Sequence, residues 1–212
     1  PVFVVSAPRS GSTLLFETLA ASSQVATLGG ESHEIIEGLP ELRPGAAGVD
    51  SNRLEARHAG DAVVAALRER FAARLVDREG RLVSDPSRLR FVEKTPKNAL
   101  RVPFLERVFP DARYVLLWRD PRESLYSIIR AWQSGRWRTY AGLPGFSGPW
   151  SLLLPPGWRE LEGRPLAEVA ARQWIAANET ALDDLAHIDR RRWMALEYAG
   201  LLADPRSAIE RI

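Results

Sequence analysis

The stretch that decides the fold of this 212-residue chain is Ser6-Ala7-Pro8-Arg9-Ser10-Gly11-Ser12-Thr13. It follows residues 2–5, an unbroken apolar run short enough to be a buried parallel strand, and it leads into residues 14–19, which read as helix. A strand, a tight loop and a helix in this order direct several backbone N–H groups and a positive helix end at one point. Arg9 adds a full charge there and three hydroxyls lie beside it. The pattern predicts a site for a phosphate or sulfate group.

Two other interpretations of this loop can be compared with the residues. The nucleotide-triphosphate loop G-x-x-x-x-G-K-[ST] can be placed with Gly11 on its second glycine. Ser6 then replaces the first glycine and Ser12 replaces the lysine, so two of the four fixed positions fail. An ordinary strand–turn–helix corner with Ser/Thr capping would explain Ser10 and Gly11, but not Arg9 together with three hydroxyls. The residues therefore favour an anion site.

Length and composition indicate one domain over residues 1–212 with a substantial core, since 45% of the residues are apolar. A net charge of +2 disfavours nucleic acid as a partner, and we interpret Arg190-Arg191-Arg192 as a solvated helix end. The absence of cysteine excludes disulfides and thiolate metal sites, and three scattered histidines make a histidine metal site improbable. We expect no metal.

Hydropathy bears on the cellular location of the protein. No apolar run reaches the roughly 18 residues of a membrane span, and no signal peptide is visible. We therefore expect a cytoplasmic protein. The chain starts at Pro1 rather than at a methionine, which is consistent with a segment upstream.

The second polar stretch is residues 29–34, after a short extended segment at residues 24–28. Two glycines give the backbone freedom just before Glu31, at the point where a second strand would deliver a side chain to the edge of the sheet. Glu31 is a candidate general base, and His33 is its competitor because an imidazole suits proton abstraction near neutral pH. The alternative is that Glu31 or Glu34 is a helix N-terminal acid with Ser32 as the cap.

Between this stretch and the next, residues 39–52 are rich in glycine and proline and predict a surface loop. Residues 61–77 predict a covering helix with an apolar stripe that includes Leu67 and Phe71. Residues 82–90 predict a loop or a poorly defined sheet edge.

Residues 91–94 predict a short strand that runs into a turn broken by Pro96. Lys94 and Thr95 then lie at the carboxyl end of a strand, which is the edge where open α/β sheets bind ligands. A solvent-exposed turn lysine is the alternative for Lys94.

Residues 114–118 predict another buried strand, and Pro121 suits the first turn of the helix that follows it. Arg119 lies between the two, at the same edge of the sheet, and its planar guanidinium matches a phosphate. The alternative is an ion pair of Arg119 with Asp120 or another nearby acid.

The chain from 133 to 165 is rich in glycine, proline and aromatic residues. A long irregular segment of this kind predicts either a lid or acceptor pocket, or a separate apolar cluster packed under the loop. A helix over 164–187 and a last strand over 192–196 follow.

Three motifs in this order resemble sulfotransferases that use 3′-phosphoadenosine 5′-phosphosulfate (PAPS). Residues 8–13 match the phosphosulfate loop Pro-[Arg/Lys]-Ser-Gly-[Ser/Thr]-Thr throughout, and residues 93–96 match [Glu/Asn]-Lys-x-Pro. In these enzymes an arginine at the end of a strand and a serine eight residues later bind the 3′-phosphate, as Arg119 and Ser127 would here. The pair Gly30-Glu31 resembles the base of the protein-tyrosine branch, while other branches use histidine.

The resemblance implies a P-loop-like three-layer α/β fold, with a central mostly parallel sheet flanked by helices. It implies PAPS as the cosubstrate, without a metal, and transfer of a sulfuryl group to a hydroxyl. It assigns catalytic roles to Arg9 and Lys94 and to either Glu31 or His33. Donor binding is assigned to Arg9, Ser10, Gly11, Ser12, Thr13, Arg119 and Ser127. Relatives continue beyond the position of Ile212 with elements that close over the adenosine, and we expect these to be missing from residues 1–212.

The acceptor stays open among small molecules, carbohydrates, lipids, carrier-bound acyl chains and peptide tyrosine, and the oligomeric state is not fixed. Two other function classes also remain. A P-loop kinase would share the strand–loop–helix start and use ATP with magnesium, although the loop lysine is missing. A non-catalytic PAPS-binding domain of a larger synthase would bind the donor without turnover.

Overall fold

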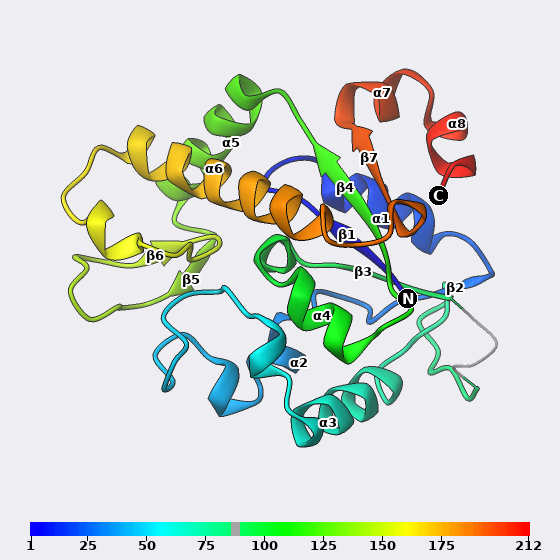
Figure 1. Ribbon diagram of the computed structural model, residues 1–212. Coiled ribbons are helices and arrows are strands. Elements are labelled where there is room, and N and C mark those ends of the chain that lie inside the picture. The colour runs from blue at the N-terminus through cyan, green and yellow to red at the C-terminus, as the bar shows by residue number, and fades with distance from the viewer. Residues whose placement is uncertain (86–89) are drawn as a thin grey trace.

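The computed structural model describes residues 1–85 and 90–212, and its centre is a five-stranded sheet with the order β2-β3-β1-β4-β7 (Figure 1). The strands are β1 (Val2–Val5), β2 (Val25–Ala26), β3 (Arg90–Lys94), β4 (Arg113–Trp118) and β7 (Trp193–Glu197). Every neighbouring pair is parallel. The predicted α/β class and parallel sheet are confirmed, and the first apolar run is the central strand.

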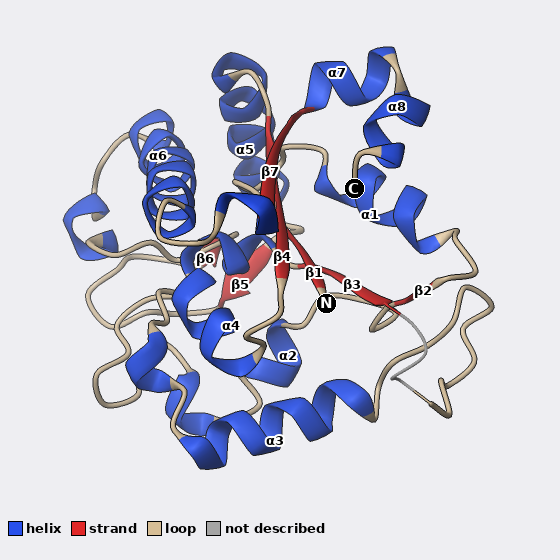
Figure 2. Ribbon diagram, turned by 45° about the vertical axis from the view of Figure 1, so that its right-hand side comes forward, coloured by secondary structure: helices blue, strands red, loops and turns tan. Residues whose placement is uncertain are grey.

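Helices follow the strands and cover the sheet. They are α1 (Ser12–Ala20), α2 (His33–Ile36), α3 (Asp61–Ala72), α4 (Val102–Val108), α5 (Pro121–Ser134), α6 (Leu166–Leu185), α7 (Tyr198–Ala203) and α8 (Pro205–Glu210). A 3-10 helix, Pro96–Leu100, links β3 to α4. Figure 2 shows the sheet nearly edge-on, with α1, α7 and α8 on one side and α3, α4 and α6 on the other.

The central strand divides its side chains between these two layers. Phe3 and Val5 belong to the larger core, with residues of α3, α4 and α6, whereas Val2 and Val4 belong to the smaller core, with residues of α1 and α8. Successive side chains of a strand point to opposite faces, so an entirely apolar strand must be covered on both sides. The predicted three-layer arrangement follows from this requirement.

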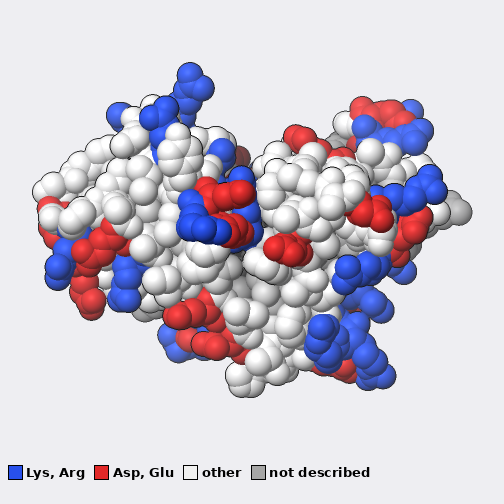
Figure 3. Space-filling view, turned by 90° about the horizontal axis from the view of Figure 1, so that it is seen from above, with Lys and Arg blue, Asp and Glu red and all other residues white. Residues whose placement is uncertain are grey.

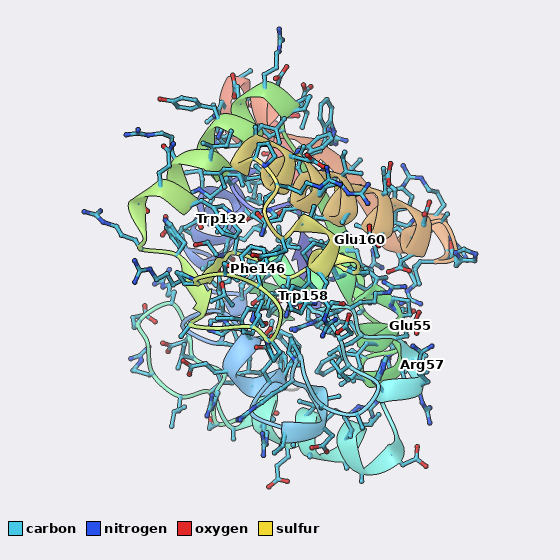
Figure 4. All side chains as sticks on the ribbon, turned by 90° about the vertical axis from the view of Figure 1, so that its left-hand side faces the viewer. Glu55, Arg57, Trp132, Phe146, Trp158 and Glu160 are labelled. Carbon is cyan, nitrogen blue, oxygen red and sulfur yellow. The ribbon has the colours of Figure 1, made fainter. Side chains whose placement is uncertain are left out.

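The aromatic segment 133–165 forms a third cluster and a short hairpin of β5 (Arg138–Tyr140) and β6 (Trp150–Ser151). Trp150 and Trp158 are buried in this cluster, with Trp132 and Phe146 packed at the edge of it. Figure 4 shows Trp132, Phe146 and Trp158 close to one another. The separate apolar cluster is thus present, while neighbouring residues of the same segment face the functional cavity described below.

Two predictions are wrong: the end of one helix and the surface position of one loop. The helix predicted over 61–77 ends at Ala72, because Val76 instead exchanges backbone hydrogen bonds with Thr27 beside β2. The predicted surface loop 39–52 contains buried residues, since Asn52 is fully buried and hydrogen-bonds to Leu154 in both directions. Long-range pairing decided both features, and local composition carries no sign of it.

Other predicted segments fall partly outside the described residues or differ in detail. Within the segment 82–90, Leu82 pairs with Val76 and Arg90 begins β3, while residues 86–89 lie outside the described residues. The three consecutive arginines form a 3-10 turn, Arg190–Arg192. Arg192 is not purely solvated, because it pairs with Glu106 and hydrogen-bonds to the carbonyl of Ala112.

We expect Gln173→Leu to destabilise the fold strongly. Gln173 is fully buried in α6; it donates to the carbonyls of Ser151 (2.8 Å) and Leu153 (2.7 Å) and accepts from the indole of Trp132 (2.9 Å). Leucine would remove these three hydrogen bonds. The Leu153 carbonyl would keep the Trp150 indole as a donor, but the Trp132 indole would lose its acceptor, so the free energy of unfolding should fall by about 2–4 kcal/mol. Urea unfolding measures the loss, with the exposed neighbour Arg172→Leu as control. Equal stability of the two variants would contradict this role.

Candidate functional site

Because the five strands are parallel, the segments that follow them meet at one edge of the sheet, where a cavity of about 570 Å³ opens. In Figure 1 the strands β4 and β7 point upward. Figure 3 shows the molecule from above, so it shows the face toward which these strands point, with basic and acidic side chains side by side next to a notch. The predicted residues that line the cavity are Arg9, Gly11, Ser12, Thr13, Glu31, His33, Lys94, Arg119 and Ser127.

The loop 6–11 between β1 and α1 has an unusual backbone. Arg9 and Gly11 both have left-handed conformations, with φ of 66° and 89°. A Cβ on Gly11 would lie 2.1 Å from the ring of Tyr198, which closes over the glycine from the start of α7. Glycine is therefore required by its φ and by the close approach of the ring. Left-handed residues in a tight loop that opens a helix allow backbone N–H groups to converge on an anion.

Two hydroxyls of this loop are buried. The Oγ atoms of Ser6 and Ser10 have no hydrogen-bond partner within the described part of the chain. A buried hydroxyl without a partner costs free energy, and such groups are tolerated where a ligand or water can satisfy them. Ser10 lies behind the cavity surface rather than on it, so of the predicted binding residues it is the one that does not line the cavity.

Arg9 joins the loop to α5. Its Nε donates to Ser127 Oγ at 3.2 Å, and its guanidinium lies 4.9 Å above the ring centre of Trp137. Ser127, chosen over Ser124 by resemblance, is the one that reaches the cavity, whereas Ser124 is buried in α5. Trp137 comes from the aromatic segment, so part of that segment contributes to the site.

Arg119 makes the local ion pair that was its alternative role, and it also lines the cavity. It contacts Glu123 at 2.7 Å, rather than Asp120, which pairs with Arg122. Its Nη1 donates to the carbonyl of Arg9 at 3.4 Å, and its guanidinium lies 4.7 Å above the ring of Tyr198. An ion pair with a partner as exposed as Glu123 contributes little energy, so it does not prevent Arg119 from binding a phosphate.

Glu31 and Lys94 meet at the centre of the cavity. Lys94 Nζ lies 2.6 Å from Glu31 Oε1, and His33 Nδ1 lies 3.6 Å from Glu31 Oε2. Lys94 is buried, so the exposed turn lysine is ruled out. Burial acts to raise the pKa of Glu31, but hydrogen bonds with His33 and Lys94 and the charge of Lys94 bring it below its ordinary value. Glu31 is therefore a carboxylate at neutral pH, in a position to accept a proton.

Ser32 does not cap α2 with its side chain. Its Oγ lies 3.2 Å from Thr95 Oγ1, and no capping hydrogen bond to the helix is present within α2. The alternative is therefore correct only in part: Ser32 is the N-cap residue and Glu34 is an acid in the first turn of α2, but Ser32 makes no side-chain cap and Glu31 lies before the helix.

Sequence reasoning missed a second pair in the cavity, Glu37 and Lys97. Lys97 Nζ donates to both carboxylate oxygens of Glu37 at 2.7 and 2.9 Å, and Arg101 donates to Glu37 at 2.7 Å. Burial and the charge of Arg101 lower the pKa of Lys97, despite the opposite effect of Glu37. Lys97 follows Lys94 by three residues in the same polar segment at the end of β3, and this proximity was the available signal.

Over 1–85 and 90–212, no group of three or more His, Cys, Asp or Glu side chains is placed to hold a metal ion. Within the same ranges, no helix is both long and apolar enough to cross a bilayer.

A family model described as the sulfotransferase family matches residues 1–212. The chain belongs to this family. Among curated relatives, protein-tyrosine sulfotransferase 2 of Gallus gallus is 29% identical over 130 residues, which are 60% of this chain and 33% of that protein. A putative protein-tyrosine sulfotransferase of Caenorhabditis briggsae is 30% identical over 133 residues, 60% of this chain and 42% of that protein. The matched stretches thus span well under half of these relatives.

Solved sulfotransferase structures share the fold. The sulfotransferase domain from the Synechococcus PCC 7002 olefin synthase superposes with a TM-score of 0.58 at 20% identity, covering 99% of this chain and 70% of that one. The sulfotransferase domain from the curacin biosynthetic pathway gives a TM-score of 0.56 at 21% identity, covering 99% and 71%. These likenesses confirm the P-loop-like α/β arrangement that the three motifs implied.

We expect Gly11→Ala to destabilise this sulfotransferase-family fold at the loop. Alanine at φ 89° is strained and its Cβ would overlap Tyr198, so the free energy of unfolding should fall by about 1–3 kcal/mol. Thermal or urea unfolding measures this. Gly142→Ala, where nothing lies within 4 Å of an added Cβ, is the control.

A double variant separates the two causes of this loss. In a Tyr198→Ala background the ring is gone, so Gly11→Ala should cost less than it does in the original chain. The same cost in both backgrounds would show that the contact with Tyr198 is irrelevant.

Proposed function

We propose that this chain transfers a sulfuryl group from PAPS to a hydroxyl acceptor. The observation that carries the proposal is the convergence of Arg9, Ser127 and Arg119 on one side of a cavity that holds the Glu31–Lys94 pair. One set suits a donor with two anionic ends, and the other suits proton removal and charge stabilisation.

Sulfuryl transfer needs the acceptor oxygen to attack sulfur in line with the leaving phosphate. The new O–S bond forms as the bond between sulfur and the bridging oxygen breaks, and negative charge builds on that oxygen. Arg9, Lys94 and the N–H groups of the loop would stabilise this charge, by several kcal/mol if they are already oriented. Arg119 and Ser127 would hold the 3′-phosphate of the donor.

Glu31 would take the proton of the attacking hydroxyl. Its lowered pKa keeps it in the basic form, and its contact with Lys94 places the base next to the group that faces the sulfuryl oxygens. His33 is the second candidate, because it lies beside Glu31 and lines the same cavity.

The acceptor side of the cavity combines apolar and charged walls. The apolar side chains Trp137, Leu152 and Leu153 come from the aromatic segment. The charged side chains Glu37 and Lys97 come from the end of α2 and from the 3-10 helix Pro96–Leu100. The acceptor panel therefore includes small phenols and alcohols, carbohydrates, lipids, carrier-bound acyl chains and tyrosyl peptides. We include tyrosyl peptides because two relatives are named protein-tyrosine sulfotransferases, and carrier-bound acyl chains because one solved structure is a domain of an olefin synthase.

Calorimetric titration with 3′-phosphoadenosine 5′-phosphate, the product of the donor, tests the donor class. Micromolar binding of this product, with no binding of ATP plus magnesium, supports the proposal and directs labelled PAPS to the acceptor panel. Magnesium-dependent ATP turnover would indicate a kinase instead. Donor binding without turnover on any acceptor would indicate a non-catalytic domain.

We expect Arg119→Ala to weaken binding of the bisphosphate product at least 10-fold, because the 3′-phosphate would lose its guanidinium partner. The analogue without the 3′-phosphate should be affected much less. The comparison uses the same titration, and Arg122→Ala, which removes an exposed arginine at the start of α5, is the control. An equal loss for both ligands would refute the assignment of Arg119.

We expect Glu31→Gln to reduce turnover at least 100-fold while the product still binds, since glutamine keeps the shape and removes the base. In the unchanged chain, activity should persist down to about pH 5. The pKa of Glu31 lies below its ordinary value, so the carboxylate is protonated only at lower pH.

The pH profile of kcat/KM distinguishes the two bases. A steep fall in kcat/KM between about pH 8 and about pH 5, the range in which imidazoles change charge, together with retained turnover in Glu31→Gln, would move the role to His33.

A further inference from the structure

Glu93 is a fully buried carboxylate directly before Lys94 on β3. It accepts hydrogen bonds from the backbone N–H of Ser32 (3.1 Å), from Asn98 Nδ2 (2.6 Å) and from the hydroxyl of Thr95. All three donors are neutral, so Glu93 has no cation among its hydrogen-bond partners. Burial raises the pKa of the Glu93 carboxyl above its ordinary value. A buried carboxyl with these neutral partners can hold segments of chain in place through its hydrogen bonds.

The segments that Glu93 joins are those that carry the central pair of the cavity. Ser32 directly follows Glu31, and Thr95 directly follows Lys94. The Ser32 N–H also donates to Thr95 Oγ1 at 2.8 Å, so the two segments are tied at two points. Ser32 and Thr95, the residues that follow Glu31 and Lys94, are thus joined by buried hydrogen bonds to each other and to Glu93, and we call this group the Glu93 node. It lies next to the 2.6 Å contact between Glu31 and Lys94.

Local structure alone gives the Glu31 segment little rigidity. It follows Gly29 and Gly30, and nothing lies within 4 Å of a Cβ placed on Gly30. The helix after it, α2, has only four residues, and its first residue is not capped by a side chain within the helix. A one-turn helix does not hold its position by itself, so the tertiary node must do so.

We propose that Glu93 is a positioning residue that holds Glu31 against Lys94 through Ser32 and Thr95. Its role in turnover rests on the proposed function, whereas its role in geometry does not. It does not touch the reacting atoms, because it is buried and does not line the cavity.

The structure supplies an informative conservative variant. Asn98 Oδ1 is buried and has no partner among the described residues. In Glu93→Gln, the new amide can accept from Ser32 and Thr95 with its oxygen, and a flipped Asn98 can present Oδ1 to the new NH₂ group. Glu93→Gln should therefore keep the geometry, whereas Glu93→Leu removes the acceptor of the Thr95 and Asn98 donors and leaves the Ser32 N–H with Thr95 Oγ1 alone.

The first readout does not depend on activity. Carbon-13 NMR titration of the Glu31 carboxyl should show its pKa moving up toward the ordinary glutamate value in Glu93→Leu, because the contact with Lys94 is lost. Exchange of the Ser32 amide should become at least 10-fold faster. Glu93→Gln should leave both readouts nearly unchanged.

The second readout is PAPS turnover on any acceptor from the panel. Glu93→Leu should lower kcat at least 30-fold with little change in the KM for PAPS, since the donor loop is outside the node, and Glu93→Gln should lose less than 5-fold. Glu106→Leu is the matched control. It removes another carboxylate that binds Tyr114 and Arg192 away from the cavity, so it should cost stability without changing Glu31.

The outcomes separate the hypotheses. Unchanged Glu31 titration and Ser32 exchange in Glu93→Leu overturn the proposal. A Glu93→Gln variant as impaired as Glu93→Leu also overturns it, because glutamine keeps the hydrogen-bonding geometry. If Glu93→Leu does not fold, the near-isosteric Thr95→Val removes the hydroxyl that links Glu93 to the Lys94 segment, and an unchanged Glu31 titration there overturns the proposal. Absence of PAPS binding in the unchanged chain contradicts the proposed function alone.

Discussion

The structure depends on one constraint, the parallel direction of the five strands. Parallel strands bring their carboxyl ends to the same edge, so every segment that follows a strand contributes to a single surface. The loop after β1, the Glu31 segment after β2, Lys94 at the end of β3, Arg119 after β4 and Tyr198 after β7 all meet there. These segments are far apart along the chain, and they come together in space only when the sheet forms.

The parallel strands also bring many basic side chains into one cavity, and ion pairs with carboxylates reduce the repulsion between them. Six lysine or arginine residues but only two glutamates line the cavity: Arg9, Lys94, Lys97, Arg119, Arg136, Arg138, Glu31 and Glu37. An excess of positive charge in a partly enclosed space attracts an anionic ligand and is unfavourable without one. The buried lysines are each held by a carboxylate, Lys94 by Glu31 and Lys97 by Glu37, which limits the cost of burying them. The arginines at the rim stay more exposed.

Backbone strain is concentrated where the site is built. Arg9 and Leu152 are the non-glycine residues with positive φ in the described ranges 1–85 and 90–212, and both line the cavity. Such conformations persist only when surrounding contacts hold them. Arg9 is held by Ser127 from α5, and the Leu152 N–H donates to the carbonyl of Trp137. The hairpin segment that looked irregular in sequence is therefore part of the wall of the site.

Sequence alone predicted the strands of the main sheet and the strand–loop–helix start, and it favoured an anion as the ligand at the sheet edge. Continuous apolar runs such as residues 2–5 can be stable only when covered on both faces, and a loop such as 8–13 has few uses besides binding an anion. Resemblance added Ser127, which helix geometry could not distinguish from Ser124. Tertiary structure decided what pairs with what: Glu37 with Lys97, Tyr198 with Gly11, and Glu93 with Ser32. These contacts join residues tens to almost two hundred positions apart, and no local pattern of hydrophobicity or propensity records them, because they form only after the layers have packed.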